Sequence, residues 1–315
     1  MGSVLITGTG GYVGGRLVAT FLERGWEVRG LARDTAPHLG VEQTVCDLAG
    51  EDAPAVLREA AAGADVVVHL AGENEVLAAS RPAAALAATV VATERVAEAC
   101  RDAGVGRLLY LSTVHVYGAR IVPDAVLSED MRPEPRSAYA ISRLASEHVA
   151  ASLSAGSYEL LVLRLTNAVG APSAPSVNRW TLVANDLCRQ GAREGELRLR
   201  SSGTQWRDFV SLGSVCGAIA AASGADGPAP APGTYNLGSG QPTTVRRLAE
   251  MIQEAFEAQT GSRPPLLAPD PEDDPPGPYR VSMAAARDAG LRLDGSLSDA
   301  VAETVRFCLE HRAEL

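Results

Sequence analysis

The stretch that decides the fold is residues 7–14, which reads TGTGGYVG. An apolar run at residues 2–6 precedes it, and residues 12–23 carry helical spacing before Gly25 ends them, so the order is strand, tight turn, helix. Gly8, Gly11 and Gly14 permit the tight turn, a close approach of the backbone to a pyrophosphate, and close packing of helix on strand. The helix N-terminus would stabilise the phosphate charge. The stretch therefore predicts a dinucleotide-binding turn.

The same alternation of strand and helix continues along the chain. Strands are expected at residues 2–6, 26–32, 41–46, 65–70, 107–112 and 158–165, and helices at residues 12–23, 53–62, 82–103 and 138–153. Strands that alternate with helices in this way form a parallel sheet covered by helices on both faces. The predicted fold class is α/β, a Rossmann-type doubly wound parallel sheet.

The alternation of strands and helices becomes less regular in the second half of the chain. An exposed loop is expected at residues 224–232, a proline-rich acidic stretch at 263–278, and helices at about 245–260 and 298–311. We expect residues 1–168 to form the Rossmann domain. Residues 169–315 would then form a smaller α/β lobe for the substrate, with some segments returning to the Rossmann domain.

Composition limits the partners and the setting. The chain has 315 residues, 46% of them hydrophobic, and a net charge of −10. It can bury a full core, and it lacks the overall basic field that attracts nucleic acid. No apolar run approaches the roughly 20 residues of a membrane span, and a strand begins where a signal peptide would lie. Five scattered cysteines without a CxxC pair fit a reducing, cytoplasmic setting, and no metal site is expected.

The basic residues exclude one kind of chemistry. All 28 are arginine, because the chain contains no lysine. Schiff-base catalysis and pyridoxal phosphate anchoring both need a lysine amine. Neither is available to this protein.

The end of the second strand bears on the choice of cofactor. An acidic residue there would bind the ribose 2′-hydroxyl of NAD, whereas an arginine accommodates the 2′-phosphate of NADP. The sequence offers Leu31, Ala32 and Arg33, so NADP is favoured and NAD remains possible; the alternative is that Arg33 is an ordinary surface charge. Asp47 and Leu48 follow the third strand, where they are placed to reach the adenine.

Several further motifs occur in a fixed order along nearly the whole chain. They are VHLAG at residues 68–72, LSTVHVYG at 111–118, Tyr139 heading a helix, RLTNAVG at 164–170, RDFV at 207–210, YNLGSG at 235–240 and a C-terminal segment at 291–307. Together with the glycine turn they resemble the extended short-chain dehydrogenase/reductases, the NAD-dependent epimerase/dehydratase family. The resemblance implies an enzyme that moves hydride at a secondary alcohol or ketone, most commonly of a sugar.

The resemblance also implies roles for individual residues. Tyr139 would be the general acid/base and Thr113 the hydroxyl that binds the same substrate oxygen. The family carries a lysine one helical turn after the tyrosine, and this chain has Arg143 there, which keeps the charge but changes its shape. The implied cofactor contacts are Gly8, Gly10, Gly11, Tyr12, Val13, Gly14, Arg33, Asp47, Leu48, Leu70, Ala71, Gly72, Tyr139 and Arg143.

Two more departures from the family narrow the reaction. Dehydratases of the family carry Asp-Glu after the catalytic threonine, and decarboxylases keep the Glu, whereas this chain has Val114 and His115. Epimerisation or plain carbonyl reduction therefore remain, with His115 as a substitute acid or a structural residue. An asparagine that the family often carries in the long helix is Thr89. These departures leave open a protein that senses a dinucleotide without turnover.

The expected substrate is a nucleotide-activated sugar. Asn167 and Arg207 match positions that contact the sugar-nucleotide diphosphate in the family, and a guanidinium suits phosphate well. The acidic run at residues 272–274 would repel a diphosphate, although Arg280 lies close by to compensate. A glycoside, cyclitol or polyketide ketone without a nucleotide is therefore the alternative. A homodimer through the helices containing Thr89 and Tyr139 is implied by the resemblance.

Overall fold

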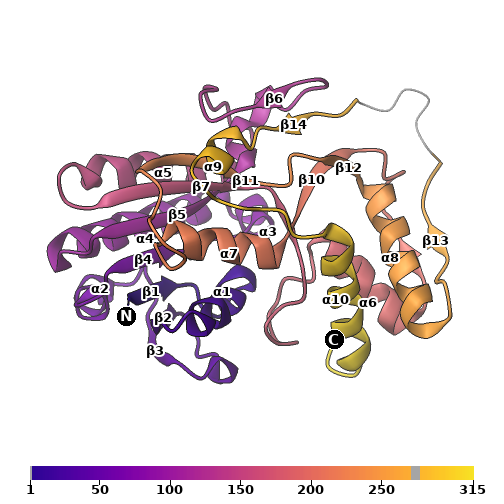
Figure 1. The fold of residues 1–315 in the computed structure, drawn as a ribbon, viewed down its shortest axis with the longest axis horizontal. Helices are drawn as coiled ribbons and strands as arrows, with labels where there is room; N and C mark the ends of the chain where they lie inside the picture. The colour runs from indigo at the N-terminus through magenta and orange to yellow at the C-terminus, as the bar shows by residue number, and fades with distance from the viewer. Residues whose placement is uncertain (1, 271–276) are drawn as a thin grey trace.

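The computed structural model describes residues 2–270 and 277–315 and has a seven-stranded parallel sheet at its centre (Figure 1). The strand order is β11-β7-β5-β4-β1-β2-β3, and every neighbouring pair is parallel. The strands are β1 Ser3–Thr7, β2 Glu27–Ala32, β3 Glu42–Val45, β4 Val66–His69, β5 Arg107–Thr113, β7 Glu159–Leu165 and β11 Gly233–Leu237. From β1 the chain adds strands β2 and β3 on one side and then β4, β5, β7 and β11 on the other. This order confirms the predicted Rossmann-type doubly wound sheet.

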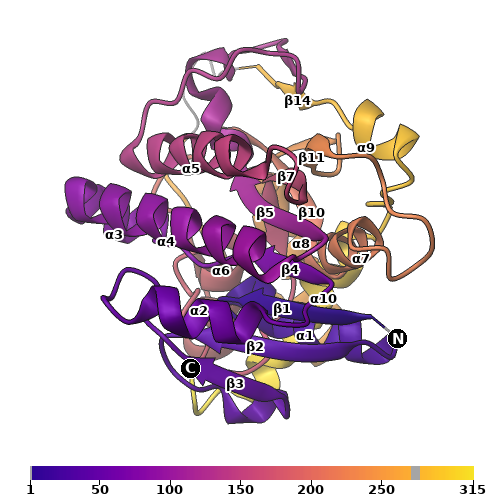
Figure 2. The same ribbon diagram turned by 90° about the vertical axis from the view of Figure 1, so that its left-hand side faces the viewer.

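Helices cover both faces of the sheet (Figure 2). One layer contains α1 (Tyr12–Glu23) and α7 (Leu212–Ala222), which pack together; the other contains α2 (Ala53–Ala61), α4 (Pro82–Ala103) and α5 (Ala138–Ser154). Side chains alternate along each strand, so β1 sends Val4 and Ile6 into one apolar core and Leu5 into the other. Burial on both faces explains why the central strands β1, β4, β5 and β7 are apolar runs in the sequence, whereas the edge strand β3 has no buried residue.

A smaller lobe with its own core follows the sheet. Three helices, α6 (Val183–Glu194), α8 (Val245–Thr260) and α10 (Leu297–Glu310), pack on one another and beside the short sheet β12-β10-β8. The remaining elements are β6 Val126–Leu127, β8 Asn167–Val169, β9 Leu197–Arg198, β10 Trp206–Ser211, β12 Pro242–Thr244, β13 Leu266–Leu267, β14 Arg280–Val281, α3 Glu75–Ser80, α9 Ala284–Asp288 and the 3-10 helices η1 Pro37–Leu39 and η2 Val114–Arg120.

Two segments of the second half return to the large sheet. Strand β11 pairs with β7 at its edge, and α7 packs against α1 (Figure 1). Both β8 and the loop after it lead directly from β7 into the smaller lobe. The crevice between sheet and lobe therefore lies at the carboxyl ends of the central strands, where ligands of open α/β sheets bind.

Candidate functional site

Twelve of the predicted site residues meet in one cavity of about 390 Å³. The cavity lies over the glycine turn and the ends of β4, β5 and β7, and it is closed on the other side by the start of α6. The sequence-predicted residues that line it are Gly8, Gly11, Tyr12, Val13, Gly14, Leu70, Gly72, Thr113, His115, Tyr139, Arg143 and Asn167. Residues from seven separate segments of the chain thus share one space.

The glycine turn has the shape that a pyrophosphate requires. A Cβ atom on Gly14 would lie 2.2 Å from the carbonyl oxygen of Gly8, so only glycine allows the helix to start this close to the strand. Gly8 has a φ of +81°, a conformation that favours glycine. No side chain caps the N-terminus of α1 at Gly11, which leaves its N–H groups for an anion. The residues present therefore fit the dinucleotide.

Thr113 and Tyr139 enter the cavity from different elements. Thr113 ends β5, and its Oγ1 accepts a hydrogen bond of 3.2 Å from the backbone N–H of His115. Because one lone pair is used in this way, the threonine O–H can donate towards the cavity. Tyr139 lies in the first turn of α5, whose N-terminus is capped by the Ser137 hydroxyl. The two elements bring a hydroxyl donor and a phenol to one side of the cavity.

Arg143 lies one turn after Tyr139 and is buried. Its guanidinium carbon is 5.3 Å from the centre of the Tyr139 ring, and its Nη1 and Nη2 donate to the carbonyl oxygens of Leu111 and Glu73, both at 3.4 Å. Burial opposes the charge, but the neighbouring Tyr110 and Tyr139 outweigh burial and raise the pKa of Arg143. A permanent positive charge therefore stands beside the phenol.

A buried ion pair fixes these elements relative to one another. Glu147 on α5 accepts hydrogen bonds from Nε and Nη2 of Arg164 on β7, at 3.1 and 2.7 Å, and from the hydroxyl of Ser112 on β5. Both charged side chains are 7% exposed. These contacts join α5, which carries Tyr139, to two strands. One is β5, which ends at Thr113, and the other is β7, which leads into residues 165–167.

His115 lies close to the phenol, in surroundings that disfavour its charged form. Its ring centre lies 6.4 Å from that of Tyr139, edge to face. Burial lowers the pKa of His115, and the charge of Arg207 lowers it further, while Glu75 partly opposes the shift. The lowered pKa favours the neutral imidazole, and the choice between a substitute acid and a structural residue for His115 stays a prediction.

The residues predicted to contact the substrate do not all line the cavity. Asn167 lines the cavity, but its amide donates to the carbonyl oxygen of Asp208 at 2.8 Å. Arg207 does not line the cavity, and its Nη1 donates to the Trp206 carbonyl at 2.7 Å. Arg280 is exposed on β14, beside β6. The structure thus does not bring Arg207 and Arg280 into the cavity, and the acidic residues 272–274 lie outside the described residues.

The residues expected at the adenosine end lie beside the cavity rather than in it. Arg33 forms an ion pair with Glu73, with 3.1 Å between Nη1 and Oε1. Asp47 is exposed and caps the Ala49 N–H, and Leu48 is buried in the core. Gly10 is exposed on the turn, and the Ala71 N–H faces Thr7 Oγ1 at 3.4 Å.

Sequence reasoning missed two charged residues of the cavity. Arg179 reaches it from the loop before α6, and its Nη2 forms an ion pair of 3.2 Å with Oε2 of Glu75 at the start of α3. The Nη1 atom of Arg179 is buried and has no hydrogen-bond partner among the described residues. Both residues belong to loops or short elements without periodicity. The only available signal was an arginine just ahead of a helix start.

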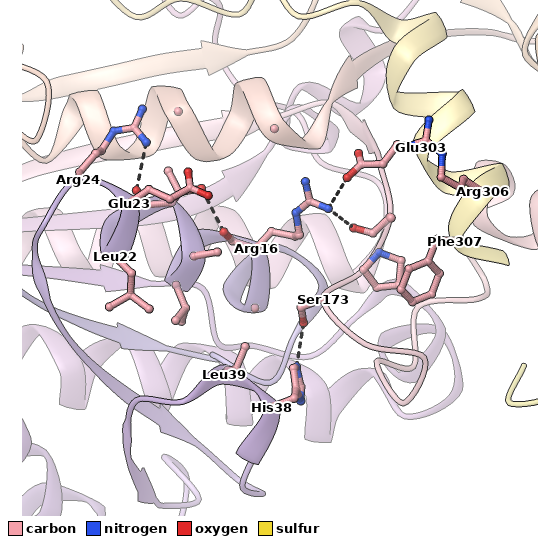
Figure 3. Close-up of a pocket in the computed structure, with 18 of the residues that line it drawn as sticks. Arg16, Leu22, Glu23, Arg24, His38, Leu39, Ser173, Glu303, Arg306 and Phe307 are labelled. Atoms are coloured by element: carbon pink, nitrogen blue, oxygen red, sulfur yellow. Dashed lines mark hydrogen bonds and ion pairs between the residues drawn. The ribbon is translucent and has the colours of Figure 1, made fainter. Parts of the chain in front are cut away.

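A second hollow lies on the outer side of α1 (Figure 3). It has a volume of about 710 Å³ and is lined by α1, α7, α10 and the 171–173 loop. Arg16 crosses it and donates to Glu303 Oε1 at 2.6 Å and to the Ala171 carbonyl at 3.2 Å (Figure 3). None of the sequence-predicted site residues lines this hollow.

Two other kinds of site are absent from residues 2–270 and 277–315. This part of the chain contains no cluster of three or more His, Cys, Asp or Glu side chains suited to a metal ion. It also contains no helix with the length and apolarity needed to cross a membrane. All five cysteines are buried as free thiols.

The fold and the glycine turn define a dinucleotide-binding protein with a hydroxyl, a phenol and a cation at the reaction end of its cleft. Residues 4–238 match the model of the NAD dependent epimerase/dehydratase family, and the chain belongs to this family. The match confirms the family and the class of enzyme predicted from the sequence, a nicotinamide-dependent enzyme of the extended short-chain dehydrogenase/reductase type.

Known proteins resemble the chain over most of its length. A dTDP-6-deoxy-L-talose 4-dehydrogenase (NAD(P)(+)) of Kitasatospora kifunensis is 31% identical over 95% of this chain and 93% of that protein. A 2-alkyl-3-oxoalkanoate reductase of Stenotrophomonas maltophilia is 30% identical over 81% of this chain and 76% of that protein. The structure of MoeE5 in complex with UDP-glucuronic acid and NAD is 25% identical, covers both chains completely and has a TM-score of 0.81.

Proposed function

We propose that the protein reduces a ketone of a nucleotide-activated sugar, or oxidises the corresponding alcohol, with a nicotinamide dinucleotide. The observation that carries this proposal is the shared cavity of Thr113, Tyr139 and Arg143 directly over the glycine turn. The dinucleotide supplies or accepts the hydride. The protein's own part is to bind the substrate oxygen, move its proton and hold the anionic end of the substrate.

The proton chemistry follows from the contacts of three side chains. Thr113 donates its O–H to the ketone oxygen, because its own lone pair is already used by the His115 N–H. The Tyr139 phenol gives its proton to the same oxygen as that oxygen becomes an alcohol. Arg143, held beside the ring, stabilises the phenolate that remains. In the oxidation direction the same proton returns to Tyr139.

Arg179 and the start of α6 support an anionic substrate. Helix α6 begins without a side-chain cap, and Leu182, Val183 and Ala184 at its start line the cavity. A helix N-terminus and a guanidinium with an unpartnered N–H together suit a phosphate oxygen. We infer that Arg179 binds the diphosphate, in place of the predicted Arg207 and Arg280.

The decisive experiment compares Arg179→Gln with the wild-type enzyme on nucleotide-linked ketosugars. We expect KM for the nucleotide sugar to rise about tenfold or more with a smaller change in kcat, because a charge-assisted contact worth about 1.5–3 kcal/mol is lost. Arg189→Gln, which removes a charge on the outer side of α6, is the control. Equal KM values for the two variants, or no binding of uridine, thymidine or guanosine diphosphates, would contradict the proposal.

A second candidate is a reductase of a ketone that carries no nucleotide, such as a glycoside, cyclitol or polyketide. It is favoured by the placement of Arg207 and Arg280 outside the cavity, and by the similarity to a 2-alkyl-3-oxoalkanoate reductase. For this candidate, turnover of small ketones would not depend on Arg179. The same variant therefore separates the two functions.

The cofactor proposed for this site is NADP, with NAD as the second possibility. Arg33 is 64% exposed at the end of β2, where the first position after the strand carries no carboxylate. Mass spectrometry of the purified protein is the first test. Retained NAD would indicate an epimerase that returns the hydride to the same molecule. An empty site that binds NADPH would indicate a reductase that exchanges its cofactor.

We also propose that two copies of the chain associate through α4 and α5. Leu86 on α4 and Ile141 on α5 are 37% and 42% exposed, and the two helices pack side by side on one face (Figure 2). Apolar side chains gathered on one face favour a protein interface. Buried free thiols support a cytoplasmic location for this assembly. A monomeric mass by light scattering would contradict the dimer.

A further inference from the structure

Glu73 connects three residues that the sequence singled out. Its backbone N–H donates to Oγ1 of Thr89 at 3.2 Å, and its carbonyl accepts from Nη2 of Arg143 at 3.4 Å. Its side chain forms the 3.1 Å ion pair with Arg33. These two contacts hold the Glu73 backbone at the end of β4, from which its carboxylate reaches Arg33.

The Arg33–Glu73 ion pair lies across the crevice in which a dinucleotide would bind. Arg33 follows β2 and Glu73 follows β4, and these strands lie on opposite sides of β1. The glycine turn follows β1, so the pair spans the crevice beside that turn. The Gly8 N–H, which bonds the Leu31 carbonyl, ties the turn to the end of β2. The adenosine half of a dinucleotide binds at this crevice in Rossmann folds.

The two side chains have opposite preferences for the ribose 2′ position. A guanidinium attracts a 2′-phosphate, whereas a carboxylate repels it and accepts a hydrogen bond from a 2′-hydroxyl. Arg33 is 64% exposed and makes a single contact with Glu73, so a phosphate can still reach its other N–H groups. Glu73 is only 18% exposed and stays near the same position.

We propose that Glu73 is a cofactor-specificity residue that takes the place of the carboxylate missing directly after β2. Its charge offsets that of Arg33, so the enzyme binds NADPH and NADH with affinities within about tenfold of each other. The inference rests on the proposed function, because it requires a dinucleotide beside the glycine turn. It adds a residue that neither the glycine turn nor the end of β2 identifies.

The test measures the dissociation constants of NADPH and NADH by fluorescence titration, without any substrate. In Glu73→Gln, we expect the preference for NADPH over NADH to rise about three- to tenfold, the size expected for one charge acting on another in a partly exposed pair. In Arg33→Gln the preference should fall. Glu254→Gln removes an equal charge from the exposed Arg247–Glu254 pair on α8 and should leave the preference unchanged.

The outcomes separate this inference from the proposed function. If Arg33→Gln lowers the preference and Glu73→Gln leaves it unchanged or lowers it, the role of Glu73 is wrong and the cofactor assignment stands. If Arg33→Gln has no effect on the preference, the assignment of Arg33 is wrong and the offset proposed for Glu73 is wrong with it. If the wild-type protein binds neither dinucleotide, both proposals are wrong. A rise in the Glu73→Gln preference that shrinks at high salt supports an electrostatic origin.

Discussion

The guanidinium group of Arg143 lies against the backbone of Gly72. A Cβ atom on Gly72 would be 2.9 Å from Nη2 and 3.0 Å from Cζ of Arg143, and Gly72 has a φ of +151°. The missing side chain therefore provides the space for an arginine at a position where the family resemblance implies a lysine. Gly72, which belongs to the family motif at residues 68–72, thus leaves room for the guanidinium.

We expect Gly72→Ala to displace Arg143 and to lower kcat/KM about tenfold or more. The backbone strain of alanine at this φ acts in any background, but the collision with the guanidinium does not. In the Arg143→Lys background the same substitution should cost less, with a coupling free energy of about 1–2 kcal/mol. A double-mutant cycle on kcat/KM and on the NADPH dissociation constant measures it. Additive effects would show that the two residues are independent.

Replacing the phenol should remove proton transfer without removing binding. For Tyr139→Phe we expect kcat to fall by about 10²- to 10⁴-fold, the usual contribution of a general acid/base. The dissociation constant of the dinucleotide should change little. Tyr235→Phe, whose hydroxyl bonds the Ala231 carbonyl away from the cavity, is the matched control. Activity that survives in Tyr139→Phe would point to another acid.

His69 should make the protein less stable in acid. Its ring is fully buried between Thr7 Oγ1 at 2.7 Å and Thr93 Oγ1 at 3.1 Å, and burial lowers the pKa of His69 to about 3. The unfolded chain, with a pKa near 6.5, binds this proton first, so stability is lost as pH falls from about 6.5 towards 3. The slope is about 1.4 kcal/mol per pH unit for one proton.

Urea unfolding of the wild-type protein and His69→Asn at several pH values measures this slope. Other buried groups contribute to the total pH dependence, so the difference between the two proteins is the informative quantity. His311→Asn, at the partly exposed residue that caps the C-terminus of α10, is the control. An unchanged slope in His69→Asn would mean that another group takes up the proton.

Two ion pairs should differ strongly in their effect on stability. Glu147→Gln leaves the Arg164 charge buried without a counter-charge, which costs about 3–5 kcal/mol. Arg16→Gln breaks the partly exposed pair with Glu303, visible in Figure 3, and should cost about 1 kcal/mol or less. Chemical denaturation of both variants makes the comparison. Similar losses would show that burial does not govern these pairs.

Six of the seven strands of the large sheet could be predicted from the sequence, the central ones because they are buried on both faces, whereas β11 was not predicted. The apolar runs ending at Thr7, His69 and Thr113 each precede a helix, and their predicted and observed bounds differ by at most one residue at each end; the helix Pro82–Ala103 is matched at both ends. The helices α6 and α7 were not predicted. Helix α7 is apolar on nearly all sides, and such a run has no helical period to detect.

The reaction end of the cavity could be predicted, whereas its charged contacts could not. Thr113, Tyr139 and Arg143 belong to motifs with local spacing. Arg179 and Glu73 act through partners 104 and 40 positions away in the sequence, Glu75 and Arg33 respectively. The local sequence pattern does not indicate which arginine pairs with which carboxylate. For Arg33 and Glu73, the pairing depends on the order of β1, β2 and β4 in the sheet.

The pairing of β11 with β7 has a consequence for how the protein reaches this structure during synthesis. Residues 1–168 contain the glycine turn and the tyrosine proposed as the general acid/base, yet their sheet ends at β7 with an unpaired edge until residues 233–237 have left the ribosome. An open edge strand of this kind recruits other chains. The first half of the protein is therefore the part most prone to aggregation while the second half is being made. A fragment that ends at residue 168 would always have this unpaired edge and would remain prone to aggregation.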